Sequence, residues 1–159
     1  MAGTGVEVGK RAPAFELPDQ DDENVSLKDL AGQWVVLYFY PKDDTPGCTT
    51  EACEFTSGIR QFHDLDAVVL GVSPDGPASH RKFIEKHQLK VRLLSDPDHK
   101  VMEAYGAWGV KQMNGKETVG AIRSTALIDP DGNIARHWPK VKAEGHAEEV
   151  SGALAELRG

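Results

Sequence analysis

The chain has 159 residues, of which 40% are apolar and 27% are charged, and its formal net charge is −7. This length predicts one domain, spanning residues 1–159, that can bury a core without disulfides. The acidic balance argues against binding to the phosphate backbone of a nucleic acid, and the longest strongly apolar run, at 34–40, is far too short to span a membrane.

The first half of the chain alternates between strand and helix patterns. Residues 34–40, WVVLYFY, are β-branched and aromatic and nearly all apolar, which is typical of a central buried strand. Residues 45–64 predict a loop that passes into a helix, because apolar residues recur there at spacings of three or four: Ala52, Phe55, Ile59 and Phe62. A second buried strand is expected at 67–73 and a helix at 77–89.

The second half continues this alternation and ends with a hairpin and a helix. A strand is expected at 92–96, followed by a helix that Asp96 caps, that begins at Pro97 and that ends at Gly106. The weakly patterned stretch 107–120 is predicted to be a loop near an edge. The remaining predicted elements are strands at 121–129 and 133–138, joined by the turn DPDG, and a helix at 146–158.

This order of elements predicts an α/β fold. The early strand–helix–strand units imply parallel pairing, and the late hairpin adds antiparallel strands. We therefore expect a mixed central β-sheet with helices on both faces.

The chain contains only two cysteines, Cys48 and Cys53, in the stretch PKDDTPGCTTEAC at 41–53. The N-terminal residues contain no apolar segment typical of a secretory signal, so we expect a cytoplasmic protein, in which cysteines are more often reactive or inert thiols than structural disulfides. Four residues separate the two thiols, which is too wide for the Cys-x-x-Cys of a dithiol exchanger. No metal site is expected, because a zinc site needs two further ligands and the histidines show no short ligand spacing.

Cys48 lies where a helix is expected to begin after a buried strand. The unpaired N–H groups and the positive dipole end of a helix start favour an anion, and the thiolate is the nucleophilic form of cysteine. The hydroxyl of Thr45 can donate to this thiolate or to a substrate oxygen, and Pro41 adds a rigid wall without an N–H group. The alternative is an inert buried cysteine in a turn rich in Pro and Gly.

The spacing Pro41-x-x-x-Thr45-x-x-Cys48 resembles the active-site motif of the peroxiredoxins, which are thiol peroxidases of thioredoxin fold. The longer string LYFYPKDDTPGCTTEACEF closely resembles the bacterioferritin-comigratory-protein or Q-type subgroup. The resemblance covers nearly the whole chain, with further similar segments at 9–19, 68–75, 93–109 and 122–134.

This resemblance implies a thiol-based peroxidase that needs no metal or other cofactor. Cys48 would be the peroxidatic cysteine, whose thiolate attacks a hydroperoxide and becomes a sulfenic acid. Thr45 and the backbone N–H of Cys48 would hold the peroxide oxygens, in a pocket that includes Pro41.

Arg123 matches the arginine of the family's active site. We expect it inside the strand 121–129, where a buried cation needs a partner such as the Cys48 thiolate or the carboxylate of Glu51. The alternative is an arginine on a solvated strand face.

Cys53 matches the resolving cysteine of some family members, which implies a Cys48–Cys53 disulfide that thioredoxin or a similar dithiol reduces. Residues five apart in a regular helix have Cα atoms about 8–9 Å apart, whereas a disulfide needs about 4.4–6.8 Å. We therefore expect the first turns of this helix to unwind on oxidation. Subgroup members are often monomers, and we expect a monomer here, although no segment excludes a dimer.

Two other functions remain open at this point. A thioredoxin-like protein disulfide oxidoreductase would share the fold, but the Cys-x-x-Cys motif is missing. A redox-sensing or holdase domain could signal by the same unwinding, and this role could coexist with peroxidase activity.

Overall fold

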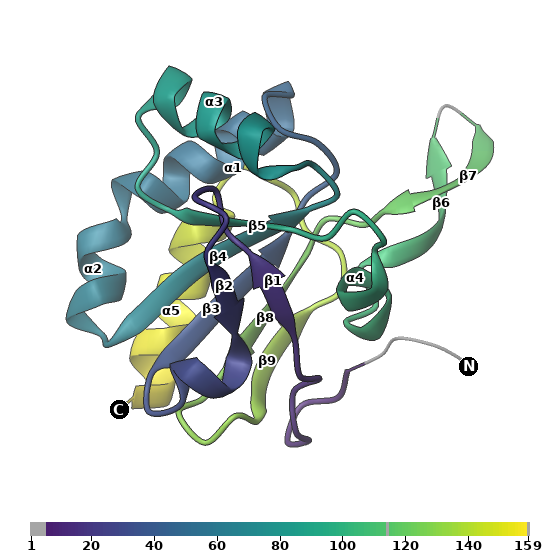
Figure 1. Cartoon of the computed structure of the whole chain (residues 1–159). Coiled ribbons are helices and arrows are strands. Elements are labelled where there is room, and N and C mark those ends of the chain that lie inside the picture. The colour runs from purple at the N-terminus through teal and green to yellow at the C-terminus, as the bar shows by residue number, and fades with distance from the viewer. Residues whose placement is uncertain (1–5, 114, 159) are drawn as a thin grey trace.

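A five-stranded mixed sheet forms the centre of the computed structural model, which describes residues 6–113 and 115–158 (Figure 1). Its strands follow the order β5-β4-β3-β8-β9. β3 pairs in parallel with β4, as β4 does with β5, whereas β8 runs antiparallel to both β3 and β9. The strand bounds are Trp34–Phe39 for β3, Ala67–Ser73 for β4, Arg92–Ser95 for β5, Ser124–Ile128 for β8 and Ile134–Trp138 for β9. The predicted mixed sheet is confirmed.

The alternation of side chains along β3 supplies two separate cores, one on each face of the sheet. One core contains Val35, Leu37 and Phe39. The other contains Val36 and Tyr38. Because both faces are buried, every position from 35 to 39 must be apolar or aromatic, which explains the continuous run in the sequence.

Helices cover both faces of the sheet, as expected, but unequally. The core with Val36 includes residues from α1 (Pro46–Ser57), α2 (Ile59–Asp64), α3 (Pro77–His87) and α5 (His146–Arg158). The opposite core is closed by α4 (Lys100–Ala104), by the 3₁₀ helix η1 (Leu27–Leu30) and by a hairpin of β1 (Glu16–Pro18) and β2 (Asn24–Ser26). Among the described residues, no helix combines the length and apolarity needed to cross a bilayer.

Most of the stretch 107–120 lies in two paired strands, so its prediction as a loop was wrong. β6 (Trp108–Met113) and β7 (Lys116–Ala121) pair antiparallel and project from the body of the molecule (Figure 1). Val110 and Val119 face each other across this ribbon and are 62% and 63% exposed. The hairpin lies largely outside the core, and its sequence therefore lacks the apolar alternation of a half-buried strand.

Other boundaries also differ from the prediction, and the helix expected within 45–64 is divided at Gly58 into α1 and α2. The expected strand 121–129 is interrupted, because Ala121 ends β7 and β8 begins only at Ser124. The helix expected from Pro97 begins at Lys100, although the carboxylate of Asp96 still accepts a hydrogen bond, of 2.9 Å, from a backbone N–H of that helix.

The contact between Gly71 and Tyr38 gives a test of this packing. A Cβ atom at Gly71 would lie 2.6 Å from the Tyr38 ring, which itself stacks on Phe55 of α1 at 4.7 Å between centroids. We expect Gly71→Ala to lower the free energy of unfolding by about 1–3 kcal/mol in urea titrations. Gly152→Ala is the control: no atom lies within 4 Å of its Cβ on an exposed part of α5, so it should raise stability by about 0.5–1 kcal/mol. A neutral Gly71→Ala variant would contradict the packing described.

Candidate active site

Cys48 lies in the first turn of α1, at the end of the loop that leaves β3. Thr45 is the N-cap of this helix and Pro46 its first residue, a position that suits the fixed φ of proline. The Cys48 side chain is almost completely buried, with 1% of its surface exposed. The first N–H groups of a helix have no partner within it, so Cys48 lies among donors that favour an anion.

Arg123 connects Cys48 to Glu51 on the next turn of α1. Its Nη2 donates to Cys48 Sγ at 3.3 Å, and its Nη1 donates to Glu51 Oε1 at 2.6 Å. Gly47 makes this approach possible, because a Cβ there would lie 3.0 Å from Nη2. The structure therefore brings Arg123 to Cys48 and Glu51, which precede it by 75 and 72 residues in the chain.

The register of the sheet explains how Arg123 reaches the start of α1. Phe39, the last residue of β3, pairs with Ser124, the first residue of β8. Arg123 lies just before this pair, in the gap between β7 and β8 rather than inside a strand as expected. Its carbonyl accepts a hydrogen bond from the N–H of Val141 at 3.0 Å. Arg123 is thus held at the end of the central strands from which the chain leads into α1.

Burial sets the ionisation of the Arg123–Glu51 pair. The Glu51 side chain is fully buried, and this desolvation raises its pKa to about 7 even though Arg123 favours the carboxylate. Its second oxygen, Oε2, has no hydrogen-bond partner among the described residues. Burial alone would lower the pKa of Arg123, but the charges of Glu51 and Cys48 outweigh it and the pKa is raised. The guanidinium therefore stays charged beside the thiol.

Thr45 and Pro41 precede Cys48 in the loop from β3, and neither makes a side-chain hydrogen bond to Cys48 among the described residues. Thr45 Oγ1 donates to the carbonyl of Lys42 at 3.0 Å, so its hydrogen points to the loop rather than to the thiol. Pro41 follows the strand and is partly exposed. A hollow of about 580 Å³ is lined by Arg123, by Pro46, Gly47 and Thr50 of α1, and by residues 141–144. Sequence reasoning missed this last segment, which has no recognisable motif.

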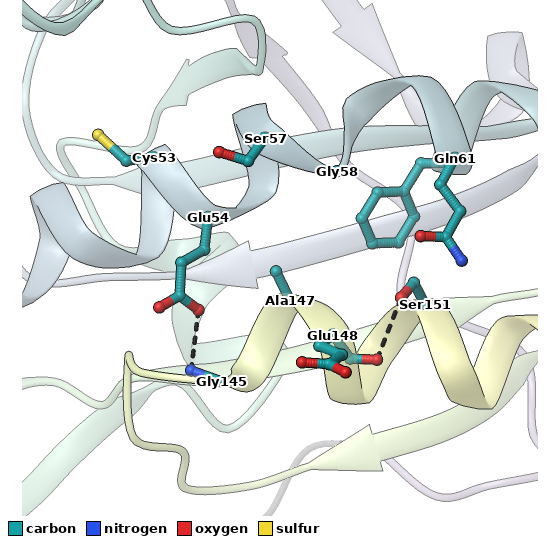
Figure 2. A pocket seen from close by; sticks show the side chains of 10 residues that line it. Cys53, Glu54, Ser57, Gly58, Gln61, Gly145, Ala147, Glu148 and Ser151 are labelled. Atoms are coloured by element: carbon teal, nitrogen blue, oxygen red, sulfur yellow. Dashed lines mark hydrogen bonds between the residues drawn. The ribbon is translucent and has the colours of Figure 1, made fainter.

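Cys53 shares α1 with Cys48 and is partly exposed, and both thiols are free. It borders a second hollow, of about 450 Å³, between α1–α2 and α5 (Figure 2). Figure 2 shows Cys53 on the α1 side, while Ala147 and Ser151 come from α5 and Glu54 accepts a hydrogen bond from the N–H of Gly145. The helix is continuous through both cysteines, so this geometry belongs to the reduced state.

Sequence reasoning also missed a buried polar cluster beside the site. Asp43, Ser79 and His80 meet there through hydrogen bonds of 2.7 Å. Asp43 precedes the Thr45–Cys48 motif, but no local pattern connects position 43 to position 80. Only the packing of α3 against the loop reveals the cluster.

Comparisons with known proteins indicate the family of the chain. The model of the AhpC/TSA family matches residues 8–137. The chain is 48% identical over 152 residues to "Peroxiredoxin Bcp" of Bacillus subtilis (strain 168), covering 96% of this chain and 97% of that protein. It is 43% identical over 151 residues to "Peroxiredoxin Bcp" of Escherichia coli (strain K12), covering 95% and 97%.

Two solved structures are also similar to the whole chain. A cysteine-to-serine mutant of PrxQ from Xylella fastidiosa superposes with a TM-score of 0.92 at 37% identity, covering 99% of this chain and 100% of that one. The bacterioferritin comigratory protein of Xanthomonas campestris, described for its alkyl peroxide reduction activity, gives 0.89 at 37% identity, covering 96% and 100%. The chain therefore belongs to the AhpC/TSA family, within its bacterioferritin-comigratory-protein or Q-type peroxiredoxins, and is a thiol-based peroxidase.

Proposed function

We propose that Cys48 is the peroxidatic cysteine of this peroxidase. The observation that carries the proposal is the contact of 3.3 Å between Cys48 Sγ and Arg123 Nη2 at the start of α1. A buried thiolate is costly unless positive charge and hydrogen-bond donors surround it. Arg123 and the helix terminus supply both.

In the first step, the Cys48 thiolate attacks one oxygen of the hydroperoxide. An S–O bond forms and the O–O bond breaks, which leaves a sulfenic acid on Cys48 and an alkoxide or hydroxide that takes a proton to leave as alcohol or water. Arg123 and the N–H of Cys48 would stabilise the charge that moves onto the leaving oxygen. Pro41 walls this pocket, and Thr45 would contribute a hydroxyl contact once its bond to Lys42 gives way.

In the second step, Cys53 acts as the resolving cysteine. Its thiolate attacks Cys48 Sγ, the S–O bond breaks, and the departing hydroxide is protonated to water, which leaves a disulfide. This step needs the first turns of α1 to unwind, because a regular helix holds the two Cα atoms too far apart. A thioredoxin-type dithiol then reduces the disulfide, and the partly exposed position of Cys53 beside an open hollow supports access to it.

Both thiols lie on one helix of one chain, so the cycle needs no second subunit. This supports our proposal that the protein acts as a monomer, which size-exclusion chromatography of the reduced and oxidised forms would test. A cytoplasmic location stays a prediction, tested by cell fractionation.

The roles of the two cysteines can be separated by substitution. Cys48→Ser should abolish hydrogen peroxide consumption in the presence of thioredoxin, thioredoxin reductase and NADPH, because it removes the nucleophile. Cys53→Ser should consume about one equivalent and then stop, with a sulfenic acid on Cys48 detectable by mass spectrometry. Sustained thioredoxin-dependent turnover by Cys48→Ser would refute the assignment.

The contribution of Arg123 is tested by Arg123→Gln. Loss of one donor to developing charge lowers rates by about 10²–10³-fold in other enzymes, and we expect a fall of that order in the second-order rate constant for Cys48 oxidation, followed by stopped flow. Arg158→Gln is a matched control, because Arg158 pairs with Asp66 at the surface. Equal rates for Arg123→Gln and Arg158→Gln would rule out the proposed role.

The raised pKa of Glu51 predicts a pH-dependent stability. Because the folded-state pKa of about 7 lies above the ordinary value of 4.5, the contribution of Glu51 is fully present below about pH 4.5 and is lost as pH rises through about 7. Relative to Glu51→Gln, the wild type should therefore lose up to about 3 kcal/mol of unfolding free energy across this range, measured by urea titration at several pH values. A constant difference between the two proteins would show that Glu51 titrates normally.

A further inference from the structure

The loop between β3 and α1 is anchored to α3 by the side chain of Asp43. One carboxylate oxygen accepts a hydrogen bond of 2.5 Å from Tyr40 Oη. The other accepts one of 2.7 Å from Ser79 Oγ and lies 2.7 Å from His80 Nδ1. Asp43 is 8% exposed and His80 is fully buried, so this anchor is shielded from water.

The hydrogen-bond partners of His80 indicate where its ring protons lie. His80 Nε2 lies 3.0 Å from the carbonyl of Leu94, which can only accept, so Nε2 carries a proton. His80 Nδ1 and Asp43 then share one more proton across 2.7 Å. Tyr40 and Ser79 also donate to Asp43, so its two carboxylate oxygens together take part in three hydrogen bonds.

A second contact joins the same loop to α3 at the surface. Asp44 accepts hydrogen bonds from Lys86 Nζ at 2.8 Å and pairs with His87 Nε2 at 2.9 Å. Such an exposed pair contributes little to stability, whereas a buried, charge-assisted bond is costly to break. The Asp43–His80 pair is thus the main anchor, and Asp44 offers a natural control beside it.

We propose that Asp43 and His80 are positioning residues for the attack of Cys48 on the peroxide. They act through the loop 41–45, which ends at Thr45, the N-cap of α1. Asp43 belongs to this loop, and its side chain bonds to Ser79 and His80 of α3. The inference rests on the proposed function, since it assigns the pair to the first step of that cycle.

The two steps of the cycle make opposite demands on this region. Peroxide attack needs the loop and the first turn of α1 to keep the positions seen in the structure, because Cys48 and its donors must be aligned. Disulfide formation needs that turn to unwind. The anchor lies before the helix, so loss of the anchor should slow the first step without slowing the second.

The test compares Asp43→Ala, Asp43→Asn and Asp44→Asn in single-turnover rapid-quench experiments with hydrogen peroxide and mass spectrometry. For Asp43→Ala we expect the rate constant of Cys48 oxidation to fall about tenfold or more, with disulfide formation from the sulfenic acid unchanged within about twofold. Asp43→Asn should retain the rate within about threefold, because its amide can donate to a neutral His80 Nδ1. Asp44→Asn should match the wild type.

Several outcomes would overturn the inference. These are an Asp43→Ala rate of oxidation equal to that of Asp44→Asn, equal slowing of both steps, or no recovery in Asp43→Asn. If Asp43→Ala does not fold by circular dichroism, His80→Gln, which removes the same contact from the α3 side, takes its place with the same expected and overturning outcomes. A wild type that consumes no peroxide would instead refute the proposed function, whatever the variants show.

Discussion

The arrangement at the start of α1 depends on one partly buried cation. Arg123 holds Cys48 and Glu51 at the same time, and each of these groups would be costly to bury as an anion without it. Desolvation therefore raises the pKa of Glu51 and the ion pair lowers it, and the value of about 7 shows that desolvation has the larger effect. The guanidinium cannot lose its charge in the same way, so it is the constant element of the site.

The pairing of the strands places this cation beside Cys48. β3 contributes side chains to a core on each face of the sheet, so its register cannot shift by one residue without disrupting one of these cores. The antiparallel register with β8 then places position 123 opposite the end of β3, where the loop to α1 departs. Packing far from the thiols thus determines which cation meets Cys48.

Particular residues show how far the sequence could predict this arrangement. The apolar run 34–40 and the Pro–Gly–Cys start of α1 were predictable because each depends on neighbours in the chain. Arg123 could be expected near Cys48 only through resemblance to a family, since its contact depends on strand register. The β6–β7 ribbon was missed because most of its described residues lie outside the core and lack apolar alternation. The Asp43–His80 contact was missed because it joins two segments through tertiary packing alone.

The continuity of α1 through both cysteines couples its folding to redox chemistry. In the proposed cycle, reduction of the disulfide lets the first turns re-form, and the free energy of this refolding adds to that of the reduction. A more stable α1 therefore makes the oxidised protein a stronger oxidant, by about 30 mV for each 1.4 kcal/mol. Contacts remote from the sulfur atoms, such as that between Glu54 and Gly145, thereby become determinants of the reduction potential.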